Sequence, residues 1–117
     1  MFSIQYEVTP DGYTICRPAG ELDAFTVHQF RQALAEMASS RHLVIDLSGV
    51  PFVDSAGLGA LIGGIRRVRE MGGTVIVACS RRTLASLLHT TGIDRIVTVT
   101  DTVEEAAATL SLASGAA

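Results

Sequence analysis

Residues 43–71 read LVIDLSGVPFVDSAGLGALIGGIRRVREM, and this stretch decides the fold. It begins with a short uninterrupted apolar run, Leu43-Val44-Ile45, which is typical of a strand covered on both faces in a parallel sheet. A loop over residues 48–53, stiffened by Pro51, leads into a predicted helix from about Ser55 to Met71. A buried strand followed by a short loop and a helix indicates an α/β domain.

The residues before this stretch predict a hairpin and a first helix. A strand over residues 2–8 would place four alternating apolar side chains on one side: Phe2, Ile4, Tyr6 and Val8. Turn residues at 10–12 then lead to a second strand over about residues 13–17. We expect Asp23 to cap the next helix, whose buried face shows three-and-four spacing: Val27, Phe30, Leu34 and Met37.

The second half of the chain repeats the order of strand and helix. It predicts a strand over residues 74–78, a short helix capped by Ser80, and a last strand over residues 96–99. A capping box at residues 102–105 begins a final helix that ends near Leu110. The element order β-β-α-β-α-β-α-β-α, with about four helices, predicts a mostly parallel sheet with an N-terminal β-hairpin and right-handed crossovers.

The length of 117 residues allows one domain. We expect that domain to cover residues 1–110, and the small-residue segment 111–117 to be a flexible tail. With 48% hydrophobic and 18% charged residues the composition is that of a globular protein.

Charge composition excludes several classes of function. All nine cationic side chains are Arg and none is Lys, so sites built on a phosphate-loop, kinase-type or Schiff-base lysine are excluded. A net charge of -3 with dispersed arginines gives no electrostatic reason to bind nucleic acid or an anionic membrane. The expected partner is therefore another protein.

The expected location is the cytoplasm. The longest apolar run, residues 57–65, is far shorter than the roughly 20 residues of a membrane span, and the N-terminus lacks the pattern of a secretory signal. Cys16 and Cys79 could form one disulfide by number, but without an export signal two reduced thiols packed in strands are favoured.

Residues 54–59, DSAGLG, are predicted where a strand leads into a helix, the usual place for sites in open α/β sheets. A dinucleotide fingerprint fails here, because the sixth position counted from Gly57 is Ile62. A hydrolase elbow fails as well, because Val53 stands where a glycine is needed. A triad of Ser55 with one of three histidines has no local support: His28, His42 or His89. No residue cluster has metal-ligand spacing, so we expect no cofactor.

Four glycines in the predicted helix need an explanation, since each costs up to about 1 kcal/mol relative to Ala. At about 100° per residue the core face consists of four apolar side chains: Leu58, Leu61, Ile65 and Val68. The opposite side consists of Ser55, Gly59, Ile62, Gly63 and Arg66. Close packing on the sheet accounts for Gly57 and Gly64 but not for the outward pair, so we interpret that side as a docking surface for a protein backbone.

Four blocks of the sequence resemble the STAS domain of bacterial anti-sigma factor antagonists. They span nearly the whole chain: GELD at 20–23, LVIDLSGV at 43–50, FVDSAGLG at 52–59 and TGI at 91–93. The third block and the Asp-Leu-Ser-Gly before it are fairly specific to this superfamily. The helix and strand pattern around them is generic.

The resemblance implies a switch. In such proteins the serine after the Asp is phosphorylated by the anti-sigma factor, a GHKL-type serine kinase, and a PP2C-type phosphatase restores it. Ser55 has this position, and Ala56 stands where many members have a second acceptor. The resemblance and the helix face together predict these partner-binding residues: Asp23, Asp54, Ser55, Gly57, Gly59, Ile62, Gly63 and Arg66.

The sequence therefore predicts a non-enzymatic anti-sigma factor antagonist, which binds its partner unphosphorylated and releases it once Ser55 is phosphorylated. STAS domains also occur in transport systems. A cytoplasmic STAS subunit that regulates a membrane lipid or anion transporter is thus the alternative, and a small hydrolase is a weaker third.

Overall fold

The computed structural model describes the backbone of residues 1–115 and the side chains up to Ser111. A five-stranded sheet forms its centre, and the strands follow one another in chain order: β1 (Ser3–Val8), β2 (Thr14–Ala19), β3 (His42–Asp46), β4 (Thr74–Ala78) and β5 (Thr98–Thr100). β1 pairs antiparallel with β2, and the other neighbours pair in parallel. The predicted fold class, a mostly parallel sheet with an N-terminal hairpin, is confirmed.

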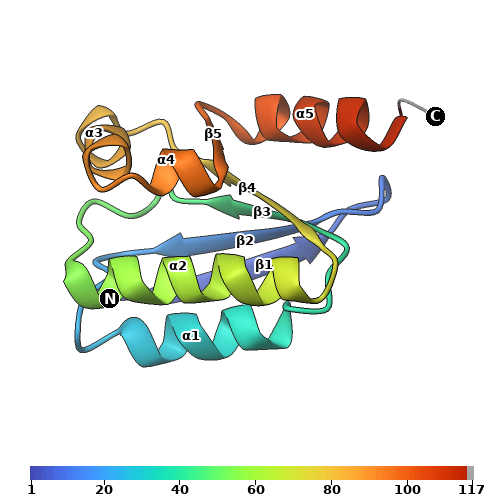
Figure 1. The fold of residues 1–117 in the computed structure, drawn as a ribbon. Helices are drawn as coiled ribbons and strands as arrows, with labels where there is room; N and C mark the ends of the chain where they lie inside the picture. Colours follow the sequence, from blue (N-terminus) through green and yellow to red (C-terminus); the bar gives the residue numbers. More distant parts are fainter. Residues whose placement is uncertain (116–117) are drawn as a thin grey trace.

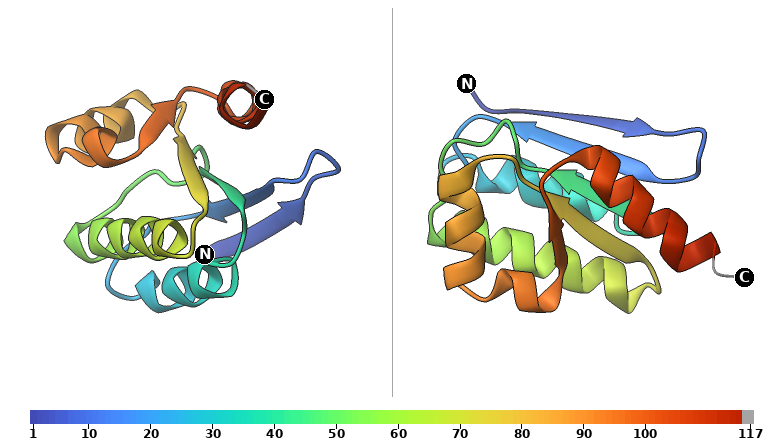
Figure 2. Two further views of the ribbon diagram at one scale, coloured as in Figure 1. Left: turned by 45° about the vertical axis from the view of Figure 1, so that its right-hand side comes forward. Right: turned by 90° about the horizontal axis from the view of Figure 1, so that it is seen from above.

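Helices cover both faces of the sheet (Figure 1). α1 (Val27–Glu36) and α2 (Ser55–Glu70) lie side by side on one face, and α5 (Val103–Gly115) lies on the other. α3 (Arg82–Thr90) and α4 (Ile93–Ile96) lie at the end of the molecule where α2 begins. Figure 2 shows the same layers from two further directions.

Alternation along the strands divides the core into two clusters. In β3, Leu43 and Ile45 join the larger cluster under α1 and α2, whereas Val44 between them joins the smaller cluster under α5. This strand is buried on both faces, as its apolar run predicts. Cys16 and Cys79 belong to the larger cluster as free, buried thiols, as predicted, although Cys79 follows β4 rather than lying in a strand. Desolvation raises the pKa of the Cys16 thiol to about 12.

Residues 1–115, whose backbone the structure describes, form five helices rather than about four. Gly92 adopts a left-handed backbone with φ of 81°, which ends α3 and redirects the chain into the single turn of α4. That turn buries Ile93, and Ile96 ends it, so the last strand begins at Thr98 and not at residue 96. A helix of four residues is too short to leave a periodic signal in the sequence.

Two predicted caps differ from the structure. α3 begins at Arg82 and not after Ser80, whose hydroxyl donates instead to the Ser48 hydroxyl at 3.1 Å. α1 begins at Val27, because the Asp23 carboxylate is used in the turn before the helix, where it accepts from the amides of Phe25 and Thr26.

The ends of the chain differ in part from expectation. α5 continues to Gly115 rather than ending near Leu110. The division into a domain 1–110 and a flexible tail 111–117 stays a prediction, and its last two residues lie outside the described part. In the hairpin, Tyr6 and Val8 are exposed although Phe2 is buried, because the hairpin extends past the helices that cover its base (Figure 2).

None of the described helices is long and apolar enough to span a membrane.

Candidate functional site

Asp54 holds the start of α2 in place. Its backbone is extended, and its Oδ1 accepts a hydrogen bond from the Gly57 amide at 3.0 Å, which makes it the N-cap. Its Oδ2 accepts from the Ala24 amide at 3.2 Å. One carboxylate therefore caps α2 and ties it to the turn that precedes α1.

That turn lies against the start of α2 through backbone contacts as well. The Leu22 amide donates to the Phe52 carbonyl at 2.9 Å, and the Asp54 amide donates to the Leu22 carbonyl at 3.1 Å. The half-buried Asp23 fixes the turn through the amides of Phe25 and Thr26, at 2.9 and 3.1 Å. The structure thus brings the turn that Asp23 fixes and the Asp54 cap together at the start of α2.

Ser55 is the first residue of α2, and its side chain is exposed. Its hydroxyl makes no hydrogen bond with any residue in the described part of the chain. The amides of Ser55 and Ala56 also donate to no acceptor there, since the Asp54 carboxylate reaches only the Gly57 amide within α2. A free hydroxyl therefore lies beside free amides at the positive end of a sixteen-residue helix.

The four glycines of α2 fall into two pairs. A Cβ at Gly57 would lie 2.7 Å from the Leu22 carbonyl oxygen, and a Cβ at Gly64 would overlap the Leu34 side chain of α1. A Cβ at Gly59 or Gly63 would meet nothing within 4 Å. The periodicity thus separates the pairs correctly, although the inward pair packs on the turn and on α1 rather than on the sheet. Gly57 is buried, so we expect it to shape the site rather than touch a partner.

The remaining residues of the predicted face are less uniform. Arg66 is exposed, as expected. Ile62 is only half-exposed, because one side of it packs against the rim of the core under α2. On the core face Leu58 is likewise half-buried, while Leu61, Ile65 and Val68 are buried.

Two aromatic residues beside the site were missed by the sequence reasoning. Phe25, in the turn that Asp23 fixes, is 95% exposed, and Phe52, two residues before Asp54, is 51% exposed. A signal for Phe25 was available, because it falls outside the three-and-four spacing of the helix that follows. Exposed aromatic side chains near a free polar group are typical of protein interfaces.

A hydrolytic triad is not assembled. His89 pairs with Asp94 through Nδ1 and Oδ2 at 2.6 Å, far along the chain from Ser55. His42 begins β3, whereas Ser55 follows the opposite end of that strand. His28, in the first turn of α1, makes no side-chain hydrogen bond with the described residues. The small hydrolase, which was the third function considered from the sequence, therefore has no geometric support.

Comparison with known proteins gives one family. A model of the STAS domain matches residues 3–106. The anti-sigma F factor antagonist of Paenibacillus polymyxa is 30% identical over 106 residues, covering 88% of this chain and 91% of that protein. This relative is named for a regulatory role and not for a reaction, in agreement with the prediction that the chain is not an enzyme.

Solved structures agree in fold. An anti-sigma factor antagonist from Mycobacterium paratuberculosis superposes with a TM-score of 0.85 at 27% identity, covering 93% of each chain. A sulfate transporter family protein from Wolinella succinogenes gives 0.78 at 19% identity, covering 91% of this chain and 90% of that one, and this likeness shows the fold alone. The chain belongs to the STAS domain family.

Proposed function

We propose that this protein is an anti-sigma factor antagonist, switched by phosphorylation of Ser55. Unphosphorylated, it binds a GHKL-type serine kinase that is also the anti-sigma factor, and so frees the sigma factor. Phosphorylated, it dissociates, and a PP2C-type phosphatase returns it to the binding form. The observation that carries the proposal is the exposed, unbonded Ser55 hydroxyl at the capped start of α2.

The chemistry of transfer places demands on the partner. The Ser55 oxygen would form a bond to the γ-phosphorus of ATP, the bond from that phosphorus to the bridging oxygen would break, and ADP would leave. The hydroxyl proton must go to a base. Asp54 is poorly placed for that role, since both of its oxygens already accept backbone hydrogen bonds. The kinase must therefore supply the base as well as the nucleotide site.

Phosphorylation should change the surface and leave the fold intact. A phosphoserine has a charge of about -1.5 to -2 at neutral pH. The free amides of Ser55 and Ala56 and the helix dipole favour that charge, whereas the adjacent Asp54 carboxylate opposes it. Because these local effects partly cancel, the release of the partner must come from new charge and bulk at the interface.

The transporter alternative shares the fold but has weaker support. The relative at 30% identity is named an antagonist of an anti-sigma factor, whereas the likeness to the transporter family protein is at 19% identity. A switch driven by ATP and directed at a sigma factor would act in the cytoplasm. It would affect transcription without contact with DNA.

Mass spectrometry tests the proposal. The protein is incubated with ATP and, in turn, with each GHKL-type serine kinase encoded in the same genome. We expect one of these kinases to add a single phosphate at Ser55 and to leave the Ser55→Ala variant unmodified. Phosphate on another residue, such as Thr83 or Thr90, would show the assignment of Ser55 to be wrong. Modification by none of them would contradict the proposed function as a whole.

A further inference from the structure

α1 and α2 enclose a groove on the side that faces away from the sheet. The two helices run in parallel, with Ala24 beside Asp54 at one end and Leu34 beside Gly64 further along. The groove between them has a volume of about 300 Å³. Its lining includes Arg31 and Ala35 from α1, and Gly59, Gly63 and Arg67 from α2.

In the described part of the chain, the only charged side chains that line the groove are two arginines, Arg31 and Arg67. Between Val27 and Ala35 the single charged residue of α1 is Arg31, and between Ser55 and Arg69 the charged residues of α2 are all arginines: Arg66, Arg67 and Arg69. These four make no ion pair with any described residue, although the chain as a whole has a net charge of -3. A basic surface on an acidic protein is complementary to an acidic partner.

The floor of the groove is suited to a helix. Gly59 and Gly63 are four residues apart and therefore lie on the same ridge of α2, one turn from each other. Since a Cβ at either position would meet nothing, the ridge is lowered there and a second backbone can approach closely. The largely exposed Phe25 lies in the turn before α1, next to Ala24, whose amide donates to Asp54 at the start of α2, and it offers an apolar contact at that end of the two helices.

We propose that this groove binds an acidic α-helix of the partner, with carboxylates of that helix on Arg31 and Arg67 and its backbone over Gly59 and Gly63. The proposal rests on the proposed function, since it takes the partner to be the anti-sigma factor kinase. It also gives the phosphate a direct effect. Ser55 is one turn before Gly59, roughly 6 Å along the helix axis, so a phosphate there would repel an acidic helix within a Debye length.

Charge reversal tests the groove with a matched control. The test variant is Arg31→Glu/Arg67→Glu, and the control is Arg41→Glu/Arg95→Glu, which changes the net charge equally at exposed sites outside α1 and α2. All four positions are exposed, so both variants should fold, which circular dichroism checks. Affinity for each GHKL-type serine kinase of the same genome is measured by isothermal titration calorimetry at two salt concentrations.

We expect the groove variant to bind the cognate kinase at least about tenfold more weakly, and the control to stay within about twofold of wild type. The wild-type affinity should also fall with added salt more steeply than that of the groove variant. Equal affinities for wild type and groove variant, or equal losses in both variants, would overturn the groove while the proposed function stands. If the wild-type protein binds none of the kinases, the proposed function fails and the groove proposal falls with it.

Discussion

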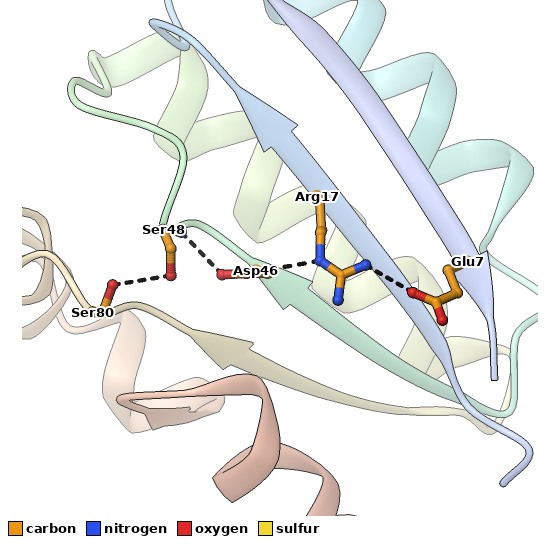
Figure 3. A network of polar contacts seen from close by, with 5 residues as sticks. All are labelled: Glu7, Arg17, Asp46, Ser48 and Ser80. Atoms are coloured by element: carbon orange, nitrogen blue, oxygen red, sulfur yellow. Dashed lines mark hydrogen bonds and ion pairs between the residues drawn. The ribbon is translucent and has the colours of Figure 1, made fainter.

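The two outer surfaces of this protein differ in whether their polar side chains have partners within the chain. On the α5 side, polar side chains of β1, β2 and the end of β3 are paired with one another (Figure 3). Arg17 contacts Glu7 at 2.9 Å and Asp46 at 3.7 Å. Beyond Asp46, the Ser48 amide donates to its carboxylate.

The network continues onto the segment between β4 and α3. The Ser80 hydroxyl donates to the Ser48 hydroxyl, and Nε of Arg81 donates to the Ser48 carbonyl at 2.7 Å. On the α1 and α2 side, by contrast, Ser55 and three exposed arginines have no such partner among the described residues: Arg31, Arg66 and Arg67. A satisfied polar surface contributes to the fold, whereas an unsatisfied one that is held in place by capped helices is available to another molecule.

The largest expected effect separates the core face of α2 from its outer face. Leu61 is 1% exposed, so Leu61→Glu buries an unpaired charge and should cost several kcal/mol, on the order of 3–5, or prevent folding. Ile62→Glu, one residue on and half-exposed, should cost about 1 kcal/mol and still weaken partner binding. Urea unfolding with a pull-down measures both. If Ile62→Glu unfolds the protein as severely as Leu61→Glu, the outer face is part of the core.

The two pairs of glycines should respond oppositely to a single methyl group. Gly57→Ala places a Cβ against the Leu22 carbonyl and should destabilise the fold by about 1–3 kcal/mol. Gly59→Ala adds a Cβ in open space within a helix and should stabilise it by up to about 1 kcal/mol. Thermal unfolding monitored by circular dichroism compares the two. A loss of stability in Gly59→Ala would mean that this side of α2 is not free.

The buried thiol of β2 gives a pH-dependent reference that involves neither outer surface. Because desolvation raises the pKa of Cys16 to about 12, the unfolded chain loses this proton first as pH rises above the ordinary thiol value. Stability should then fall between about pH 9 and 12, by at most about 1.4 kcal/mol per pH unit for this group. Urea unfolding at pH 8, 9 and 10 should show a shallower fall in Cys16→Ala. If the free energy of unfolding falls equally with pH in the wild type and in Cys16→Ala, the burial of the Cys16 thiol is contradicted.

Loss of an arginine from the α5 side should leave partner affinity unchanged, whereas loss of one from the α1 and α2 side should weaken it. Arg17→Ala removes two contacts of side chains that are partly exposed, which should cost less than about 1 kcal/mol and leave partner affinity unchanged. Isothermal titration calorimetry compares the partner affinity of Arg17→Ala with that of Arg31→Ala. A weaker affinity for Arg17→Ala than for Arg31→Ala would move the binding surface to the α5 side.

Periodicity predicted the centre of the sheet and the orientation of α2, because β3 and β4 have continuous apolar runs and α2 spans more than four turns. It could not predict α4, which has one turn, or the cap of α1, because a carboxylate before a helix serves equally well in a turn. The pairing of Ala24 with Asp54 joins segments thirty residues apart, which no local pattern encodes.

The outward glycines were predictable from helical spacing, since they needed only the angle around α2. The groove could not be predicted from the sequence, because Arg31 and Arg67 come to line the same groove only through the parallel packing of two helices. Phe25 was visible as an apolar residue outside the helical spacing, but its exposure depends on the turn that Asp23 fixes.

The central claim is that a phosphate on Ser55 removes the partner without unfolding α2. The most direct measurement is the affinity of the kinase for the unmodified and the Ser55-phosphorylated protein, with far-ultraviolet circular dichroism recorded on both forms. We predict tight binding of the unmodified form, a loss of at least about a hundredfold on phosphorylation, and superimposable spectra. Equal affinities would contradict the claim, and a loss of helical signal on phosphorylation would show that the switch acts by order and disorder instead.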